Sequence, residues 1–222
     1  QDKPDPSHVL AVFDGSFQDV SMVGNTPDGR LSKETETVIC DGYASYLTHL
    51  FKAAERESES KEFHMGVLKS FDKFRLLSAH RRGQLGVEGL NKRAEELLGA
   101  RFAKIGFSTR GKFYAGRPVI VRQNDYSIGL FNGDVGLVVP RTLPDGTAGL
   151  QVVFPDADEG VRYIAPARLP EHETVYAMTI HSSQGSEFEH AMVVLPTQAS
   201  RVVSRELIYT GVTRAAKRMT MV

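Results

Sequence analysis

The sequence predicts an α/β fold that carries a small inserted β module. Before residue 112 and after residue 172, apolar runs of strand length alternate with amphipathic helical stretches. Between those points, four short β-rich runs follow one another with turn signals and no helical stretch. The chain has 222 residues, 41% hydrophobic and 24% charged, which is enough to build a sizeable core.

The first part of the chain predicts two helices and two strands. A strand is expected near "DVSMVG" (19–24), and Ser32 is expected to cap the helix that follows it. The run "FRLLSA" (74–79) predicts a buried strand, and residues 87–98 predict a second amphipathic helix. "AERESESK" (54–61) is expected to be an exposed helix end or loop. The first helix carries an apolar stripe at helical spacing, formed by Tyr43, Tyr46, Leu47, Leu50, Phe51 and Ala54.

The middle of the chain predicts a small antiparallel barrel. Its strands are expected at "RPVIVRQ" (117–123), "DVGLVV" (134–139), "LQVVF" (150–154) and "VRYIA" (161–165). The α/β pattern then resumes with strands at 174–180 and 191–196, a helix at 203–214 and a last strand at 218–222. In that helix Leu207, Ile208, Gly211, Val212 and Ala215 are expected to form the buried stripe. We therefore expect one domain from 1–111 and 173–222, and an inserted one from 112–172.

Composition excludes some functions and leaves others open. Lys and Arg number 27, as do Asp and Glu, so the net charge predicts neither a nucleic-acid partner nor a membrane. The single cysteine, Cys40, excludes an internal disulfide framework and a cysteine-based zinc site. No run approaches the roughly 18 apolar residues of a membrane span, and the start lacks a signal-peptide pattern. An intracellular, cytoplasmic protein is expected.

Two motifs imitate nucleotide or metal sites. "GFSTRGK" (106–112) fits part of a phosphate-binding P-loop, but Phe113 stands where the loop needs Ser or Thr. A helix is expected before this segment and a strand after it, which is the reverse of strand–loop–helix, so a connector is predicted. "VVFPDADEG" (152–160) is interpreted as a surface turn, and no metal site is assigned.

The stretch "TIHSSQGSEFEHAMVVLP" (179–196) sets short polar side chains between two predicted strands. A serine nucleophile beside His181 is disfavoured, because neighbouring side chains on an extended segment point apart and no G-x-S-x-G elbow is present. Arg81 and Arg82 follow a buried strand, and Arg214 ends a packed helix, where a guanidinium is suited to reach a phosphate. Taken singly, each arginine is also consistent with ordinary surface charge.

In combination these segments resemble superfamily 1 helicases of the 5′→3′ branch, and the RecD family in particular. "AMTIHSSQGSEFEHAMVVLP" resembles motif V, "SRELIYTGVTRAAKR" motif VI and "LLSAHRRGQLGVEGLN" motif IV. "GRPVIVRQNDYSIGLFNGDVGLVV" is similar to the SH3-like insertion of this branch. The resemblance covers the chain from about residue 74 to its end, whereas the first seventy residues match only loosely.

The resemblance implies a motor of two RecA-like halves with ATP and Mg²⁺ between them. This chain resembles the second half, a RecA-like domain 2A that has the P-loop NTPase fold without the P-loop, with an SH3-like barrel as domain 2B. By resemblance, Arg214 is the arginine finger and Arg81 also approaches the γ-phosphate. The part of motif V that senses nucleotide comprises Gln184, Gly185 and Glu187.

The remaining implied contacts are with single-stranded DNA. In motif V they involve Thr179, His181, Ser182 and Ser183. In the insertion they involve Asn124, Phe131 and Asn132, although this loop also suits a plain hairpin turn. RecD relatives usually have Lys where this chain has Ser182, which removes one positive charge from the DNA side.

The implied function is the C-terminal motor half of an ATP-dependent 5′→3′ DNA helicase subunit of exodeoxyribonuclease V, acting in double-strand break repair and recombination, so the chain is expected to be a fragment of a longer protein. The expected partners are single-stranded DNA, an N-terminal RecA-like half and the other exodeoxyribonuclease V subunits, with no membrane. Alone, the chain is expected to hydrolyse no ATP. The alternative is a non-catalytic DNA- or protein-binding module with degenerate helicase motifs.

Overall fold

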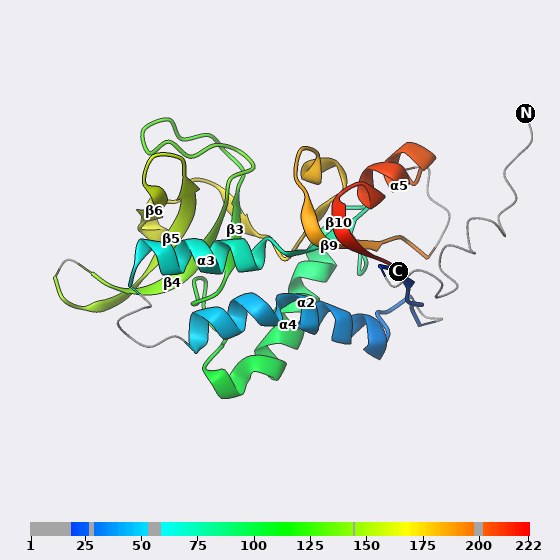
Figure 1. The fold of residues 1–222 in the computed structure, drawn as a ribbon, viewed down its shortest axis with the longest axis horizontal. Helices are drawn as coiled ribbons and strands as arrows, with labels where there is room; N and C mark the ends of the chain where they lie inside the picture. Colours follow the sequence, from blue (N-terminus) through cyan, green and yellow to red (C-terminus); the bar gives the residue numbers. More distant parts are fainter. Residues whose placement is uncertain (1–18, 27–28, 53–58, 144, 198–201) are drawn as a thin grey trace, which may run out of the picture. The chain divides into compact units, whose positions relative to one another are not determined.

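The computed structural model describes residues 19–26, 29–52, 59–143, 145–197 and 202–222 (Figure 1). These residues form two units. The parallel unit comprises the described parts of Gln1–Ile39, Phe74–Leu90 and Ala177–Val222. The antiparallel unit comprises the described parts of Cys40–Lys73 and Asn91–Tyr176. Each unit is built on its own sheet, one parallel and one antiparallel, whereas the predicted domains 1–111 with 173–222 and 112–172 stay a prediction.

The parallel unit holds a five-stranded sheet in the order β1-β10-β9-β2-β8, in which all neighbours are parallel. Every residue of β2 is buried, as expected for a parallel sheet that is covered on both faces. The strands are β1 (Val20–Met22), β2 (Phe74–Ser78), β8 (Ala177–Thr179), β9 (Phe188–Val194) and β10 (Ala215–Met221).

The two helices predicted in the first part of the chain are present, and the second is longer than predicted. In α2 (Lys33–Phe51) the Ser32 hydroxyl accepts a hydrogen bond from Thr35 N at 3.1 Å, so the predicted cap is confirmed. Helix α4 (Val87–Phe102) extends beyond its predicted end. The predicted stripe of α2 is buried at Tyr43, Tyr46, Leu47 and Leu50, partly exposed at Phe51, and at Ala54 lies outside the described residues.

Helix α5 (Arg205–Val212) is shorter than predicted, and its buried stripe is narrower. Leu207 and Gly211 are buried, whereas Val212 is 39% exposed and Ala215 already begins β10. The helix ends early because β10 pairs with β9 from Ala215 onward, which requires an extended backbone there. Figure 1 shows α5 beside β9 and β10.

The antiparallel unit contains the four predicted strands and a fifth, in the order β6-β5-β4-β3-β7. The predicted strand 174–180 is wrong as a single element, because it divides at Val175–Tyr176 between β7 and β8. The pairing leaves β6 and β7 at the two edges, so closure into a barrel stays a prediction. The strands are β3 (Pro118–Val121), β4 (Val135–Thr142), β5 (Ala148–Asp156), β6 (Gly160–Ile164) and β7 (His172–Thr174).

Helix α3 (Lys61–Phe71) was not predicted, although its cap follows the usual rule. The Ser60 hydroxyl accepts from Phe63 N at 3.0 Å. Buried His64 on this helix lies 2.9 Å, through Nδ1, from the hydroxyl of Tyr163 on β6. Burial and nearby Arg141 lower the pKa of His64 to about 4, so the ring is neutral near pH 7.

A buried group of tyrosines fixes the segment between β7 and β8. Tyr43 donates its hydroxyl hydrogen bond to the carbonyl of Tyr176. Tyr46 donates to the carbonyl of Gly116 at 3.1 Å, and Tyr114 donates to Glu95 Oε1 at 2.7 Å. These bonds satisfy polar groups that would otherwise be costly to bury. They hold the chain immediately before β8.

The segment 106–112 lies between a 3₁₀ turn at Ala103–Ile105 and strand β3, as expected for a connector. Gly106 has φ 92°, a left-handed conformation that ends the turn and suits glycine. Within the described part of the chain, no helix is long and apolar enough to span a membrane.

Candidate nucleotide and DNA site

The segment after β8 is a 3₁₀ turn at His181–Ser183 and not an extended run, which corrects the expectation from sequence. The hydroxyl oxygen of Thr179 accepts from Ser182 N at 3.1 Å and lies 2.8 Å from Ser182 Oγ. Ser183 is fully buried and donates its hydroxyl to the Ile180 carbonyl at 2.7 Å. Both serine hydroxyls therefore bond groups of the turn itself.

The turn presents only some of its predicted DNA-contacting side chains at the surface. His181 and Ser182 are exposed and Thr179 is partly exposed, whereas Ser183 points inward. A buried hydroxyl that already donates to a carbonyl has no surface to offer a DNA strand. Ser183 supports the turn, and contact of the other three with DNA stays a prediction.

Residues Gln184–Glu187 connect the turn to β9. Gly185 has φ 85°, a left-handed conformation that glycine adopts without strain. Ser186 N donates to the Ser183 carbonyl at 3.0 Å, which holds this loop against the turn. Gln184, Gly185 and Glu187 are all exposed, so the predicted nucleotide-sensing residues are accessible.

Arg214 is held by acceptors from two segments. Its Nε donates to the Thr210 carbonyl at 3.1 Å and its Nη1 to the Ser186 carbonyl at 2.8 Å. Its Nη2 donates to Thr213 Oγ1 at 3.2 Å. The Arg214 carbonyl in turn accepts from Phe188 N at 2.8 Å. The structure thus brings Arg214 together with the loop 184–187.

The fixed guanidinium retains binding capacity. It carries five N–H groups, and three of them bond described residues. The two that are left belong to different terminal nitrogens, one to Nη1 and one to Nη2. Each terminal nitrogen of Arg214 therefore keeps one N–H group that can be donated to a phosphate oxygen.

Arg81 lies in a tight, well-bonded loop after β2. The Ser78 hydroxyl donates to the Leu85 carbonyl at 2.7 Å, and the Arg81 carbonyl accepts from Glu88 N at 3.0 Å. Gly86 is required for close approach, because a Cβ there would lie 2.2 Å from the Arg82 carbonyl oxygen. The loop directs Arg81 and Arg82 outward, and both are exposed.

The two predicted catalytic arginines lie at opposite ends of the parallel strands. Arg81 follows the carboxyl end of β2, and Arg214 precedes the amino end of β10. Ile180 N donates to the Ser78 carbonyl at 3.0 Å, so the Arg81 loop and the 3₁₀ turn start together at the carboxyl ends of β2 and β8. Arg214 precedes β10, whose first residue Ala215 is in register with Phe188, the first residue of β9. Their meeting at one phosphate stays a prediction.

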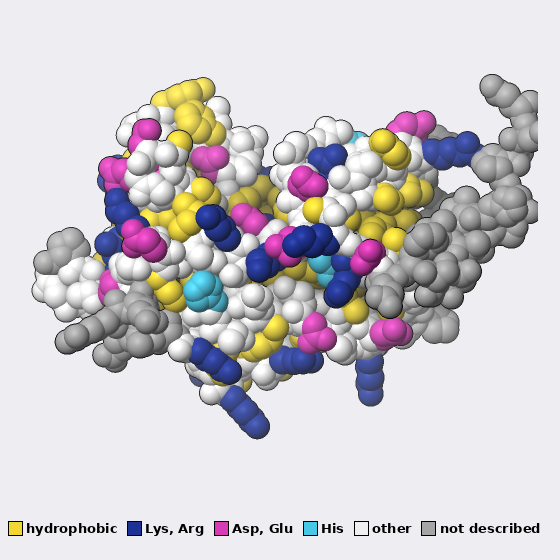
Figure 2. All heavy atoms as spheres, viewed as in Figure 1, with side chains coloured by type: hydrophobic (Ala, Val, Ile, Leu, Met, Phe, Trp, Pro, Cys, Tyr) yellow, Lys and Arg dark blue, Asp and Glu magenta, His cyan; other side chains and the backbone are white. Residues whose placement is uncertain are grey.

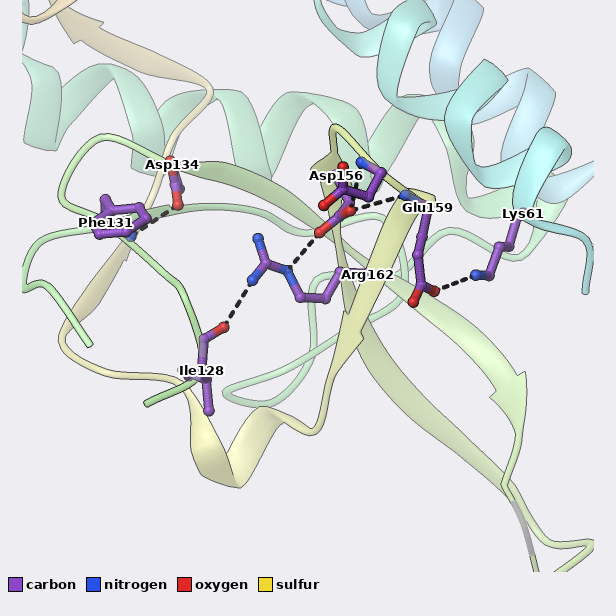
Figure 3. A network of polar contacts seen from close by, with 8 residues as sticks. Lys61, Ile128, Phe131, Asp134, Asp156, Glu159 and Arg162 are labelled. Atoms are coloured by element: carbon purple, nitrogen blue, oxygen red, sulfur yellow. Dashed lines mark hydrogen bonds and ion pairs between the residues drawn. The ribbon is translucent and has the colours of Figure 1, made fainter. Parts of the chain in front are cut away.

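The predicted DNA loop of the antiparallel unit is held by its own polar groups. Asn124 Oδ1 accepts from Asn132 N at 2.8 Å, and Asp134 Oδ2 accepts from Phe131 N at 2.8 Å. Figure 3 shows this second bond and Arg162, whose Nη1 donates to the Ile128 carbonyl at 2.9 Å. The Ser127 hydroxyl holds the pKa of Asp125 below its ordinary value.

This loop leaves aromatic rings facing solvent. Tyr126 is 78% exposed and Phe131 47% exposed, and their ring centroids lie 5.9 Å apart in an edge-to-face pair. The asparagines therefore fit the hairpin-turn interpretation, while the rings provide flat surfaces for a base.

Sequence reasoning missed two groups around Arg214. Thr213 was not singled out from the sequence, although a hydroxyl beside an arginine is a visible signal. The Ser186 carbonyl is a backbone atom, for which the sequence carries no signal. Both matter because they fix the guanidinium.

The charges at this site are individual side chains, among them Arg81, Arg82, Glu187 and Arg214. No group of three or more His, Cys, Asp or Glu side chains among the described residues could hold a metal ion. On the face shown in Figure 2, Lys and Arg side chains are interspersed with Asp and Glu.

Residues 174–222 match the UvrD-like helicase C-terminal domain family. This range contains the 3₁₀ turn, the loop 184–187, α5 and Arg214.

Longer similarity is found to two curated proteins, each the RecBCD enzyme subunit RecD. The protein from Mycolicibacterium smegmatis is 44% identical over 156 residues, which cover 70% of this chain and 26% of that protein. The protein from Haemophilus influenzae is 43% identical over 220 residues, which cover 96% of this chain and 32% of that protein. The chain thus spans about a quarter to a third of the length of these relatives.

Among solved structures, a Pif1 helicase from Candida albicans matches 83% of this chain and 54% of its own, with 12% identity and a TM-score of 0.43. The sequence similarity, by contrast, extends through both units of the chain. The chain is therefore related to the RecD subunit of the RecBCD enzyme, and its residues 174–222 are similar to the UvrD-like helicase C-terminal domain family.

Proposed function

We propose that this chain supplies the second motor half of an ATP-dependent 5′→3′ DNA helicase of the RecD type. It acts within a subunit of exodeoxyribonuclease V in double-strand break repair and recombination. The parallel unit is its RecA-like domain, and the antiparallel sheet is an SH3-like barrel inserted in it. Its partners are single-stranded DNA, a first RecA-like half and the other subunits of that enzyme.

One observation carries this proposal: Arg214 is fixed at the surface by the Thr210 and Ser186 carbonyls and by Thr213. An ordinary surface arginine is mobile and contributes little. Here the fork is immobilised beside an exposed loop, with two N–H groups left over. That arrangement suits a group that must meet charge developing on a phosphoryl oxygen.

The other residues take complementary roles. Arg81 also approaches the γ-phosphate, and Gln184, Gly185 and Glu187 sense the nucleotide beside Arg214. Thr179, His181 and Ser182 contact the DNA backbone, while Ser183 shapes their turn. Hydroxyl and backbone donors hold phosphates without reading sequence, as translocation requires. The first half provides most ligands of ATP and Mg²⁺, so the chain alone hydrolyses no ATP.

The test is Arg214→Ala in the intact protein as its gene encodes it. Because the guanidinium acts on the transition state, kcat for DNA-stimulated ATP hydrolysis is expected to fall by about 10³–10⁵-fold, with little change in KM. Arg205→Ala, an exposed arginine at the start of the same helix, is the matched control and keeps normal turnover.

A non-catalytic DNA- or protein-binding module would respond differently. Arg214→Ala would then leave ATP turnover and unwinding at the level of the Arg205→Ala control. Mg²⁺-dependent turnover by the purified chain, abolished by Arg214→Ala, would contradict the division of ligands between two halves.

A further inference from the structure

The hydroxyl of Thr213 connects Arg214 to the end of α5. Thr213 Oγ1 donates to the Thr210 carbonyl at 3.0 Å and accepts from Arg214 Nη2 at 3.2 Å. Arg214 Nε donates to the same Thr210 carbonyl at 3.1 Å. The three groups therefore close a small ring of hydrogen bonds at the helix end.

The local sequence explains why this ring forms. The last carbonyls of a helix have no partner within the helix and carry its negative dipole end. Thr213 N donates to the Tyr209 carbonyl and Arg214 N to the Gly211 carbonyl. The Thr210 carbonyl lies between those two and receives the side chains of Thr213 and Arg214. The cation of Arg214 is thus placed at the favourable end of the helix.

Within the described residues, Thr213 is the side-chain partner of the guanidinium, since the other two acceptors are main-chain carbonyls. Because the guanidinium is planar and rigid, the two carbonyl contacts alone leave it able to tilt about the line that joins them, and Thr213 is the third contact that fixes its plane. Nη2 also carries one of the two N–H groups available to a phosphate. Loss of the hydroxyl would leave the whole guanidinium plane held at two points and able to tilt.

We propose that Thr213 is a positioning residue for ATP hydrolysis, which acts by holding the Arg214 fork in the orientation that meets the transferring phosphoryl group. This proposal rests on the proposed function, because it requires Arg214 to act on that group. Thr213 is exposed, so its hydroxyl fills no cavity and contributes little to folding.

The test measures kcat and KM for DNA-stimulated ATP hydrolysis by the intact protein. Thr213→Val keeps the side-chain shape and removes both hydrogen bonds. A hydrogen bond to a charged group corresponds to about a ten- to hundredfold change, so kcat is expected to fall by that factor. KM for ATP and the unfolding midpoint are expected to stay close to wild type. Thr213→Ser restores the hydroxyl and is expected to return kcat to within about threefold of wild type.

Two further variants separate positioning from other effects. In an Arg214→Ala background, Thr213→Val is expected to cause no additional loss of kcat, because the guanidinium that Thr213 positions is gone. Thr37→Val is the matched control, since Thr37 is an exposed helical threonine whose hydroxyl donates to the Lys33 carbonyl at 2.8 Å. It is expected to leave kcat unchanged.

The outcomes distinguish the two proposals. Normal turnover of Arg214→Ala would overturn the proposed function and this inference with it. If Arg214→Ala is inactive while Thr213→Val is fully active, the positioning role alone is wrong. The positioning role is also wrong if serine fails to rescue kcat, or if Thr213→Val lowers the residual rate of Arg214→Ala.

Discussion

Two segments that were predicted to meet ligands are built in opposite ways: Arg214 with the loop 184–187, and the loop 124–134. In the parallel unit, carbonyls of two segments hold the side chain of Arg214 and leave part of its fork available. In the antiparallel unit, Asn124 and Asp134 bond the backbone of their own loop, and the rings of Tyr126 and Phe131 face outward. The segment with Arg214 therefore offers a fixed charge, and the loop 124–134 offers flat apolar surfaces. Charge suits a phosphate, whereas rings suit a base.

The largest expected effect tests whether charge alone is sufficient in the parallel unit. Arg214→Lys keeps the positive charge but cannot reach three acceptors and a phosphate together, because an ammonium is a point donor. We expect kcat for ATP hydrolysis to fall by roughly a hundredfold or more, with KM little changed. Arg205→Lys serves as the control. If kcat of Arg214→Lys stays within about threefold of wild type, the fixed fork is unnecessary.

The next effect concerns the sheet that supports the aromatic loop. A Cβ at Gly136 on β4 would lie 2.7 Å from the Phe154 ring and 2.8 Å from the Val153 carbonyl oxygen. Because the backbone cannot yield easily, Gly136→Ala should destabilise the antiparallel sheet by about 1–3 kcal/mol. Hydrogen exchange should show faster exchange in β4 and β5.

Gly24→Ala is the matched control for that change, since nothing lies within 4 Å of a Cβ at Gly24. If Gly136→Ala leaves hydrogen exchange of β4 and β5 unchanged, the Phe154 ring and the Val153 carbonyl do not restrict the side chain at position 136.

A smaller effect is expected from the aromatic loop itself. Phe131→Ala removes one ring while the bonds from Asn124 and Asp134 preserve the loop. Stacking of one base is worth about 1–3 kcal/mol, so affinity for single-stranded DNA should fall accordingly, with Phe131→Tyr close to wild type. Val202→Ala changes an exposed apolar residue of the parallel unit and should have no effect. Equal affinity of all three variants would leave the rings without a role in DNA binding.

The smallest effect is a pH dependence of stability that involves both units. Burial lowers the pKa of His64, near Arg141 and Glu59, and of His190, near Arg218, to about 4 from the ordinary 6.5. As pH falls below about 6.5, the unfolded chain binds protons before the folded one does, so stability is lost between about pH 6.5 and pH 4.

Thermal unfolding at several pH values measures this dependence. The midpoint should decrease from pH 7 to pH 5, and His64→Gln should reduce that decrease, leaving the part due to His190. An unchanged slope in His64→Gln would show that the ring titrates freely in the folded protein.

Most of the fold was predictable because its signals are local. β2 and the first turn of α2 follow from an apolar run and from Ser32 as a cap. Helix α3 was missed because Gly66 and His64 look unsuited to a buried helix. Each is explained by a distant partner: a Cβ at Gly66 would lie 2.8 Å from the His49 ring, and His64 bonds Tyr163.

The candidate site was predictable in its residues but not in its geometry. Arg214 could be singled out from its place at the end of a packed helix. Its acceptors could not, because two are main-chain carbonyls that only tertiary structure brings near. The pairing of Arg214 with the loop 184–187, and of the Arg81 loop with the 3₁₀ turn, likewise follows from strand order and register.

In the proposed function, Arg214 of the parallel unit contacts the phosphoryl group while that group is being transferred. The most direct measurement compares the affinities of the intact protein, with DNA and Mg²⁺, for ADP and for ADP with aluminium fluoride, a mimic of that group. Wild type should bind the mimic more tightly than ADP, because catalytic contacts strengthen in the transition state. Arg214→Ala should lose at least about tenfold of that preference while binding ADP normally. An undiminished preference in Arg214→Ala would contradict the account.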